Sequence, residues 1–219
     1  MMNIKLNKII KYLIYSDLIF YTGWGLISPI FSIFLLQNIV GAGTLVVGIA
    51  AAINLIVRSL VRVPFGMYAD KSQKISFNLM FLGLLLTSLV PLGYMYSTQA
   101  WHIYILQAIY GIVIAMSTSG WTSIFSKHMD HGKESTEWGI DAVAVGIGPG
   151  IAAAAGGAVA QLFGYPALFV SVTIFGLVGT FALLIIRKEV ISCKTKDGKP
   201  CPLHIALKNR IKRNHNGTH

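Results

Sequence analysis

The chain has 219 residues, of which 54% are hydrophobic and 12% are charged, and its formal net charge is +10 at pH 7. Soluble domains carry about 25% charged residues, so this composition argues against a water-soluble fold and indicates a membrane protein. The positive charge does not indicate nucleic-acid binding, because the basic residues lie between and after apolar runs and do not alternate with aromatic residues on one face. The expected partner of most of the surface is therefore the lipid bilayer.

Six apolar segments follow one another along the chain, separated by short connections. We predict membrane-spanning helices at about 10–37, 43–68, 75–97, 101–126, 139–162 and 166–188, with ends good to about 2–4 residues. Helices are expected because the alternating pattern of membrane β-barrel strands is absent. The prediction is an all-α membrane protein, with a six-helix bundle over residues 1–190 and a basic tail over residues 191–219.

The distribution of basic residues predicts the orientation of this bundle. Every Lys and Arg other than Arg58 and Arg62 lies near the N-terminus, in the second and fourth connections, or from the end of the sixth segment onward. Cytoplasmic loops are enriched in Lys and Arg, so both termini are expected in the cytoplasm, with the bundle in the cytoplasmic (plasma) membrane.

Apart from Lys11 at its start, the charged residues inside the first two segments are Asp17, Arg58 and Arg62. Asp17 and Arg62 lie at similar depths and are able to pair, whereas Arg58 lies one helical turn deeper on the face of Arg62. Charged side chains inside spans are costly and often functional. Two interpretations stay open. Asp17 is a protonatable coupling group with Arg58 in substrate binding or gating, or Asp17 and Arg62 form a purely structural pair.

The first segment also contains a group of aromatic, small and proline residues: Tyr21, Gly23, Trp24, Gly25, Ser28 and Pro29. Glycines around an aromatic residue, followed by a proline, predict a helix that bends. Tyr21 and Trp24 are candidates for the wall of a substrate cavity, which Tyr110 and Trp121 of the fourth segment are expected to share. Simple packing is the alternative role for these aromatic residues.

The connection between the second and third segments reads GMYADKSQK. It resembles the cytoplasmic signature of the major facilitator superfamily, Gly-x3-Asp-(Arg/Lys)-x-Gly-(Arg/Lys), through Gly66, Asp70, Lys71 and Lys74, whereas Gln73 occupies the position of the second glycine. Asp70 is expected to cap the following helix or to pair with a basic group. The resemblance implies one six-helix half of a secondary-active transporter.

A second, partial resemblance lies in the fifth segment, which is similar to the antiporter-type motif Gly-x3-Gly-Pro-x2-Gly-Gly of that superfamily. Its counterparts here are Gly148, Pro149, Ala152, Gly156 and Gly157. Ala152 replaces a glycine of the motif, and the proline is displaced to position 149. Small residues at every fourth position also provide a smooth face for close helix contact, so packing is the alternative to an antiporter role.

Two further polar residues lie in the fourth and fifth segments. Gln107 stands where many members of the superfamily have an arginine, so a proton-relay role is not transferred to it, but it stays a candidate for the substrate cavity. Asp141, near the start of the fifth segment, is expected at the membrane interface, with a role as a site residue as the alternative.

The basic tail contains Cys193 and Cys201, whose spacing matches no metal site, so reduced thiols are expected. Leu203, Leu207 and Ile211 recur every four residues among basic residues. Either a short amphipathic helix on the inner leaflet or a solvated, disordered tail fits this pattern.

The resemblance covers about half of a usual transporter of the superfamily, which has two six-helix halves around one cavity. The chain is expected to be a half-size member that pairs with itself, or the N-terminal half of a longer protein; we favour a homodimer. The function implied is alternating-access transport of a small organic solute, with proton coupling as one expectation. The alternative is a non-transporting membrane adaptor whose tail binds lipid or a partner. No nucleotide loop, metal motif or nucleophile triad is present, so no enzymatic activity and no cofactor are expected.

Overall fold

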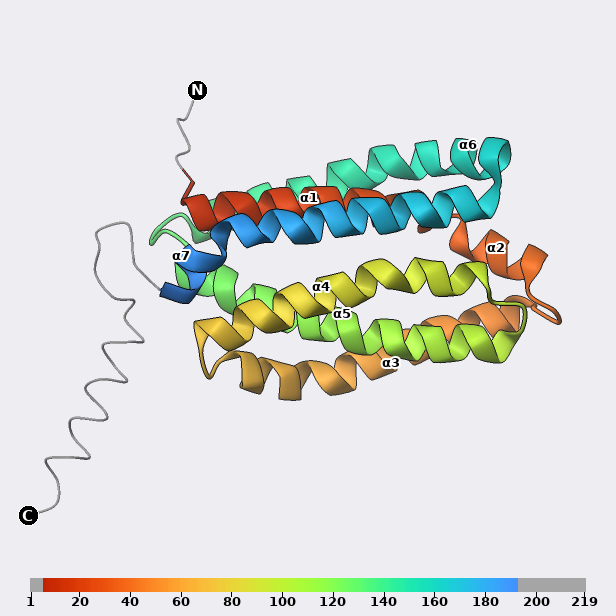
Figure 1. The fold of residues 1–219 in the computed structure, drawn as a ribbon, viewed down its shortest axis with the longest axis horizontal. Coiled ribbons are helices and arrows are strands. Elements are labelled where there is room, and N and C mark those ends of the chain that lie inside the picture. The colour runs from red at the N-terminus through yellow and green to blue at the C-terminus, as the bar shows by residue number, and fades with distance from the viewer. Residues whose placement is uncertain (1–5, 193–219) are drawn as a thin grey trace, which may run out of the picture.

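The computed structural model describes residues 6–192 and is helical throughout them, apart from turns and one isolated bridge between Val40 and Gln99 (Figure 1). This confirms the all-α prediction for that part of the chain. The elements are α1 (Lys8–Ile27), α2 (Phe31–Asn38), α3 (Thr44–Ala69), α4 (Gln73–Met95), α5 (Ala100–His128), α6 (Glu134–Ala182), the 3-10 turn η1 (Leu183–Ile186) and α7 (Arg187–Ser192). The predicted basic tail with its two cysteines lies outside the described residues.

Five helical runs are long and apolar enough to cross a membrane: Lys8–Asn38, Thr44–Ala69, Gln73–Met95, Ala100–His128 and Glu134–Ser192. The number differs from the six predicted segments because the last run contains both the fifth and the sixth of them. Within it α6 doubles back at Gly164, whose φ of 80° and ψ of 170° belong to a region that glycine alone adopts readily. Figure 1 shows the two arms of α6 running in opposite directions, with α1 between them. We call residues 134–163 the first arm and residues 165–182 the second arm.

The first helical run is interrupted near Pro29, where the sequence predicts a bend. α1 ends at Ile27 and α2 begins at Phe31, and the backbone N–H of Ile30 bonds to the carbonyl of Ile27 across the turn. Proline lacks the N–H that would continue the helical ladder, which accounts for the break.

Small residues set the order in which the helices pack. A Cβ added to Gly156 or Gly25 would collide with backbone atoms of the opposite helix, so the first arm of α6 lies directly against α1. Ser16 of α1 donates a hydrogen bond of 2.9 Å to the carbonyl of Gly179 in the second arm. On its other side the second arm meets α4, where Gly176 faces Ser88.

The remaining helices continue this row of packed helices, which we call the arc. α4 packs on α5 through Gly83 and Gly120, and α5 packs on α3 through Gly111, which faces the backbone of Asn54 and Arg58. The spatial order is therefore α3, α5, α4, the second arm, α1 and the first arm. α3 and α6 form no extensive contact with each other within the described part of the chain, so the arc is open between its two ends.

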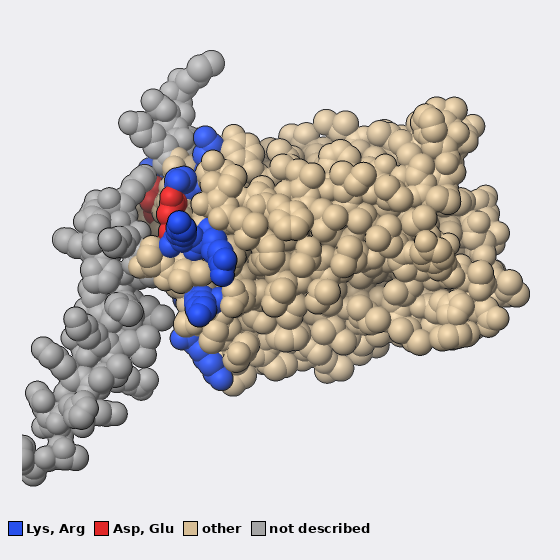
Figure 2. Space-filling model, viewed as in Figure 1, with Lys and Arg blue, Asp and Glu red and all other residues tan. Residues whose placement is uncertain are grey.

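The exposed surface of the described residues carries its charges mainly at one end and is largely apolar along its length. Little of α3 is buried, and Leu45, Leu60 and Val63 are each about two-thirds exposed or more. Figure 2 shows Lys and Arg gathered at the end where the N-terminus and α7 lie, in the face that it views. At this end an ion pair of 2.5 Å joins Lys8 of α1 to Glu189 of α7.

Candidate functional site

A cavity of about 490 Å³ lies between α1, α5 and the first arm of α6, with α3 and α4 at its edges. We call it the acidic cavity. Its lining residues are Asp17, Tyr21, Arg62, Leu84, Ser117, Thr118, Trp121, Thr122, Trp138, Asp141, Ala142, Val145 and Gly146.

The two carboxylates of this cavity are both removed from solvent. Asp17 is 6% exposed and Asp141 is 8% exposed. The Oδ1 atom of Asp141 is buried without a hydrogen-bond partner, and within residues 6–192 neither carboxylate takes part in an ion pair. A buried acid without a partner is costly, so these groups are free to bind something that enters the cavity.

The structure adds to two expectations. Asp141 is buried and lines the cavity, because the first arm packs closely on α1. Asp17 and Arg62 line the same cavity but form no ion pair, since no N–O distance between them is within 4.0 Å among the described residues. The reason is architectural. Arg62 belongs to α3, which α5 holds on the opposite side of the opening, where Ser119 donates a hydrogen bond of 3.3 Å to the carbonyl of Arg62.

Arg58 lies one turn from Arg62 toward the other end of the bundle. Its backbone N–H lies beside Gly111 of α5, and its side chain is half-buried. Arg58 is not among the residues that line the acidic cavity. Of the two arginines, only Arg62 therefore contributes directly to this cavity.

An aromatic cluster forms one wall of the acidic cavity. The rings of Trp121 and Trp138 have centroids 5.6 Å apart, and both contact Phe125, at 4.5 Å and 4.8 Å. The indole Nε1 of Trp121 is buried without a hydrogen-bond partner among the described residues. The cluster joins α5 to the first arm of α6, so it holds Asp141 and the polar face of α5 in one place.

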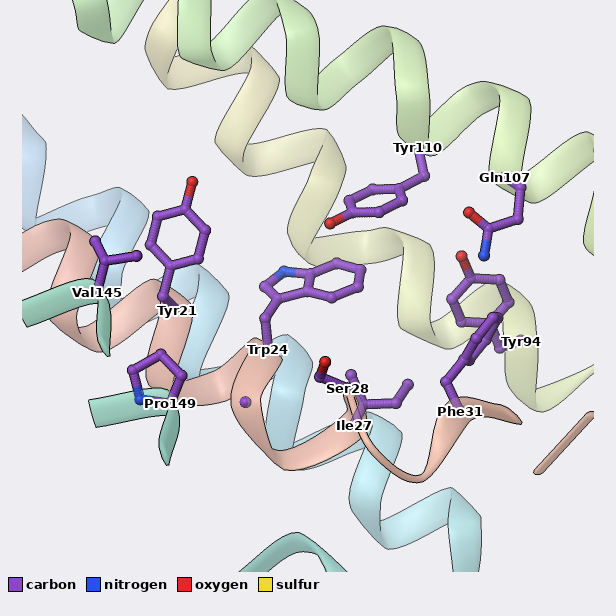
Figure 3. Close-up of a pocket in the computed structure, with 11 residues that line it drawn as sticks. Tyr21, Trp24, Ile27, Ser28, Phe31, Tyr94, Gln107, Tyr110, Val145 and Pro149 are labelled. Carbon is purple, nitrogen blue, oxygen red and sulfur yellow. The ribbon is translucent and has the colours of Figure 1, made fainter. Parts of the chain in front are cut away.

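A second cavity of about 340 Å³ adjoins the first, and we call it the aromatic cavity (Figure 3). Tyr21 and Val145 belong to both cavities. Figure 3 shows the indole of Trp24 beside the ring of Tyr110, and these rings stack with centroids 4.5 Å apart and an interplanar angle of 11°. Gln107 lines this cavity, and its Oε1 is buried without a partner in the described part of the chain.

The residues of the partial antiporter motif lie at the contact between α6 and α1. A Cβ on Gly148 would meet the side chains of Leu18 and Thr22, and Pro149 packs against Gly25. Ala152 is buried, whereas the nearest atom to a Cβ on Gly157 is 3.9 Å away. Pro149 also lines the aromatic cavity, so this contact shapes the cavity walls.

The loop signature lies between α3 and α4, beside a third cavity of about 300 Å³ that Gly66, Asp70 and Arg62 help to line. Asp70 accepts a hydrogen bond of 3.3 Å from Ser123 and lies 3.6 Å from the ammonium of Lys127. Asp70 was expected either to cap the following helix or to pair with a basic group, and in the structure it pairs with Lys127. The N-cap of α4 is Ser72 instead, which accepts a hydrogen bond of 3.2 Å from the backbone N–H of Ile75.

The other lysines of the signature lie on the surface. Lys71 is exposed, with its ammonium 5.0 Å from the ring centroid of Tyr68, and Lys74 is exposed in the first turn of α4. Neither lysine lines the acidic cavity, the aromatic cavity or the cavity beside the loop.

Several lining residues were missed by reasoning from the sequence. Trp138 lies among polar residues near the start of α6 and gives no pattern of its own. Trp121 was among the expected cavity residues. A signal did exist for its polar neighbours on α5, because Ser117 lies one helical turn before Trp121 and Thr118 lies one turn before Thr122. Within residues 6–192 no group of three or more His, Cys, Asp and Glu side chains is placed to hold a metal ion.

Comparison with known proteins agrees with this architecture. The model of the Major Facilitator Superfamily matches residues 14–213, which is most of the chain. No curated protein sequence matches it. The match confirms the resemblance seen in the loop signature, and it agrees with the apolar helices that are long enough to cross a membrane. The chain therefore belongs to the major facilitator superfamily and is an integral membrane protein of the transporter type.

Proposed function

We propose that the chain is one subunit of a secondary-active transporter, which works by alternating access as a homodimer and moves a small organic solute coupled to protons. The observation that carries this proposal is the pair of buried carboxylates, Asp17 and Asp141, which face an open cavity without a partner among the described residues. Groups of this kind inside a membrane bundle mark solute or proton pathways. Asp17 is the proposed coupling group.

The proposed topology has six membrane crossings, with both termini in the cytoplasm. Two arms of α6 on either side of Gly164 account for the fifth and sixth crossings, since the run Glu134–Ser192 has 59 residues and a crossing needs about 20. The basic end seen in Figure 2 supports the orientation, because cytoplasmic ends are enriched in Lys and Arg.

The proposed dimer follows from the open arc. One copy supplies a wall of a transport path and leaves the opposite side bare, between α3 and the first arm of α6. Arg62 is exposed on α3 at the edge of the acidic cavity, and an unpaired guanidinium inside a membrane bundle is costly. The first arm presents a ridge of small, exposed residues: Ala142, Gly146, Gly150, Ala154 and Ala158. Such ridges allow close helix association in membranes, so we assign this side to the second copy.

Transport is tested in proteoliposomes loaded with a pH-sensitive dye, with a pH gradient imposed and a panel of organic amines, sugars and acids added outside. The wild-type protein is expected to give a solute-dependent change of internal pH. Asp17→Asn is expected to abolish it and Arg58→Ala to reduce it. Asp130→Asn, which changes an acid in the polar connection before α6, is the matched control. Flux that is unchanged in both variants would rule out the roles of Asp17 and Arg58.

The adaptor alternative makes the opposite prediction. A protein that only presents its tail would give no solute-dependent pH change, would tolerate Asp17→Asn, and would lose function when residues 193–219 are removed.

The dimer is tested by cross-linking in lipid vesicles. Cys193→Ser and Cys201→Ser remove the two native thiols, and a single cysteine is then introduced at Gly150 of the proposed interface. A copper-catalysed disulfide is expected at Gly150→Cys. The control Val178→Cys, which is 53% exposed on the second arm, is expected to stay monomeric. Equal cross-linking at the two positions would contradict the assigned interface.

A further inference from the structure

We propose that the acidic cavity binds a monovalent organic cation with aromatic substituents, held by Asp17 and Asp141 against the indole rings of Trp121 and Trp138. This inference rests on the proposed function and names the substrate class for it. Four observations carry it: the charge of the cavity, its aromatic wall, the hydroxyl groups of α5 and the available volume.

The charge of the cavity favours one positive charge. Two carboxylates and one guanidinium line it, so with all three ionised it holds one net negative charge. Arg62 does not neutralise either acid directly, because no ion pair joins them among the described residues. Asp17 and Asp141 are both more than nine-tenths buried, and a buried acid without a partner is stabilised by a bound cation. A dication would carry more positive charge than the single net negative charge of the cavity. An anion would be repelled by both carboxylates.

The aromatic wall also attracts positively charged ligands. Cations bind over the faces of tryptophan rings within about 6 Å of the centroid, and this attraction grows when the site is shielded from water. Trp121 and Trp138 contact each other and Phe125, so their rings are held in position before a ligand enters. Asp141 lies close to one turn after Trp138 on the first arm, which places carboxylate and indole on neighbouring parts of one wall.

The hydroxyl groups of α5 add to the negative potential. Thr118 already donates its proton to the carbonyl of Ile114 at 2.9 Å, and Thr122 donates to the carbonyl of Thr118 at 2.8 Å. Their hydroxyl protons therefore point back to the helix, and the lone pairs of their oxygens are left for the cavity. A wall whose hydroxyls act as acceptors favours a positively charged ligand.

The volume fits a ligand larger than a metal ion. The acidic cavity measures about 490 Å³, and sites for drug-sized molecules measure about 300–1,000 Å³. The adjoining aromatic cavity, which shares Tyr21 and Val145 with the acidic cavity, extends the apolar surface available to ring substituents.

The test compares two ions of the same shape and opposite charge, tetraphenylphosphonium and tetraphenylborate. Binding to the full-length protein in proteoliposomes is measured by equilibrium dialysis, with protein-free vesicles subtracted to remove partition into lipid. We expect saturable binding of the phosphonium and none of the borate. Asp17→Asn and Asp141→Asn should each weaken phosphonium binding about tenfold or more, because each removes a charged contact from a buried site.

The matched control is Glu137→Gln. Glu137 is fully buried in the same arm, one turn before Asp141, but it does not line the cavity. Its substitution removes the same charge and should leave phosphonium binding within about twofold. Trp138→Leu, which keeps both carboxylates, should weaken binding by a smaller factor of about two to thirty, as expected for a lost cation–π contact. Thermal unfolding of each variant verifies that it is folded.

The outcomes are distinct. Equal binding of the two ions, a preference for the borate, or a loss in Glu137→Gln as large as in Asp141→Asn would overturn the cation site. Binding does not require transport, so the two proposals fail separately. Phosphonium binding without solute-dependent proton movement would contradict the transporter proposal alone, whereas proton-coupled flux of a neutral or acidic solute without phosphonium binding would contradict the cation site alone.

Discussion

Replacing Gly156 by alanine should loosen the contact on which both cavities depend. An added Cβ would lie 2.7 Å from the carbonyl carbon of Leu26 and 2.9 Å from its Cα, and it would clash with the carbonyl oxygen as well. Non-bonded carbon atoms prefer separations of about 3.5–4.0 Å, so the first arm of α6 has to retreat from α1 by about 0.8 Å or more. All of these atoms belong to the backbone, so no side-chain rotation can relieve the clash.

Overpacking of this kind costs about 1–3 kcal/mol, which for a chain of this size lowers the melting temperature by about 2–12 °C. Thermal unfolding in a mild detergent measures the shift. Gly139→Ala is the control, because Gly139 lies in the same arm outside the proposed interface and a Cβ there meets nothing within 4 Å. It should leave the melting temperature unchanged or raise it, since alanine favours helix over glycine. Equal melting temperatures for Gly156→Ala and Gly139→Ala would refute the close contact of α1 with the first arm.

Two further substitutions test the turns at the ends of the bundle. Gly164→Ala places a side chain at a φ of 80° and ψ of 170° and should destabilise the protein by about 1–3 kcal/mol, seen as a lower melting temperature; no loss would contradict the turn between the arms. Lys127→Ala removes the ion pair with Asp70, whose side chain is 72% exposed, so the melting temperature should change by the equivalent of about 0–1 kcal/mol. A drop as large as that of Gly164→Ala would contradict this assignment.

Some features of the protein follow from local composition alone. Long apolar segments indicate a membrane protein, and a backbone in lipid satisfies its hydrogen bonds by forming helices. The fold class and the type of secondary structure could therefore be predicted from local sequence. The loop signature is readable for the same reason. Gly66 and Asp70 belong to a short connection whose spacing does not depend on distant contacts, and the family match confirms the interpretation.

The site was decided by tertiary packing. Asp17 and Asp141 are far apart in sequence, and they share one cavity only because small residues of α6 allow the first arm to lie against α1. Asp17 and Arg62 have similar predicted depths in the membrane, which suggested an ion pair. Depth does not determine the direction in which a side chain points from its helix. α5 holds α3 at the other edge of the arc, and that placement alone separates Arg62 from Asp17 and leaves both carboxylates open to a ligand.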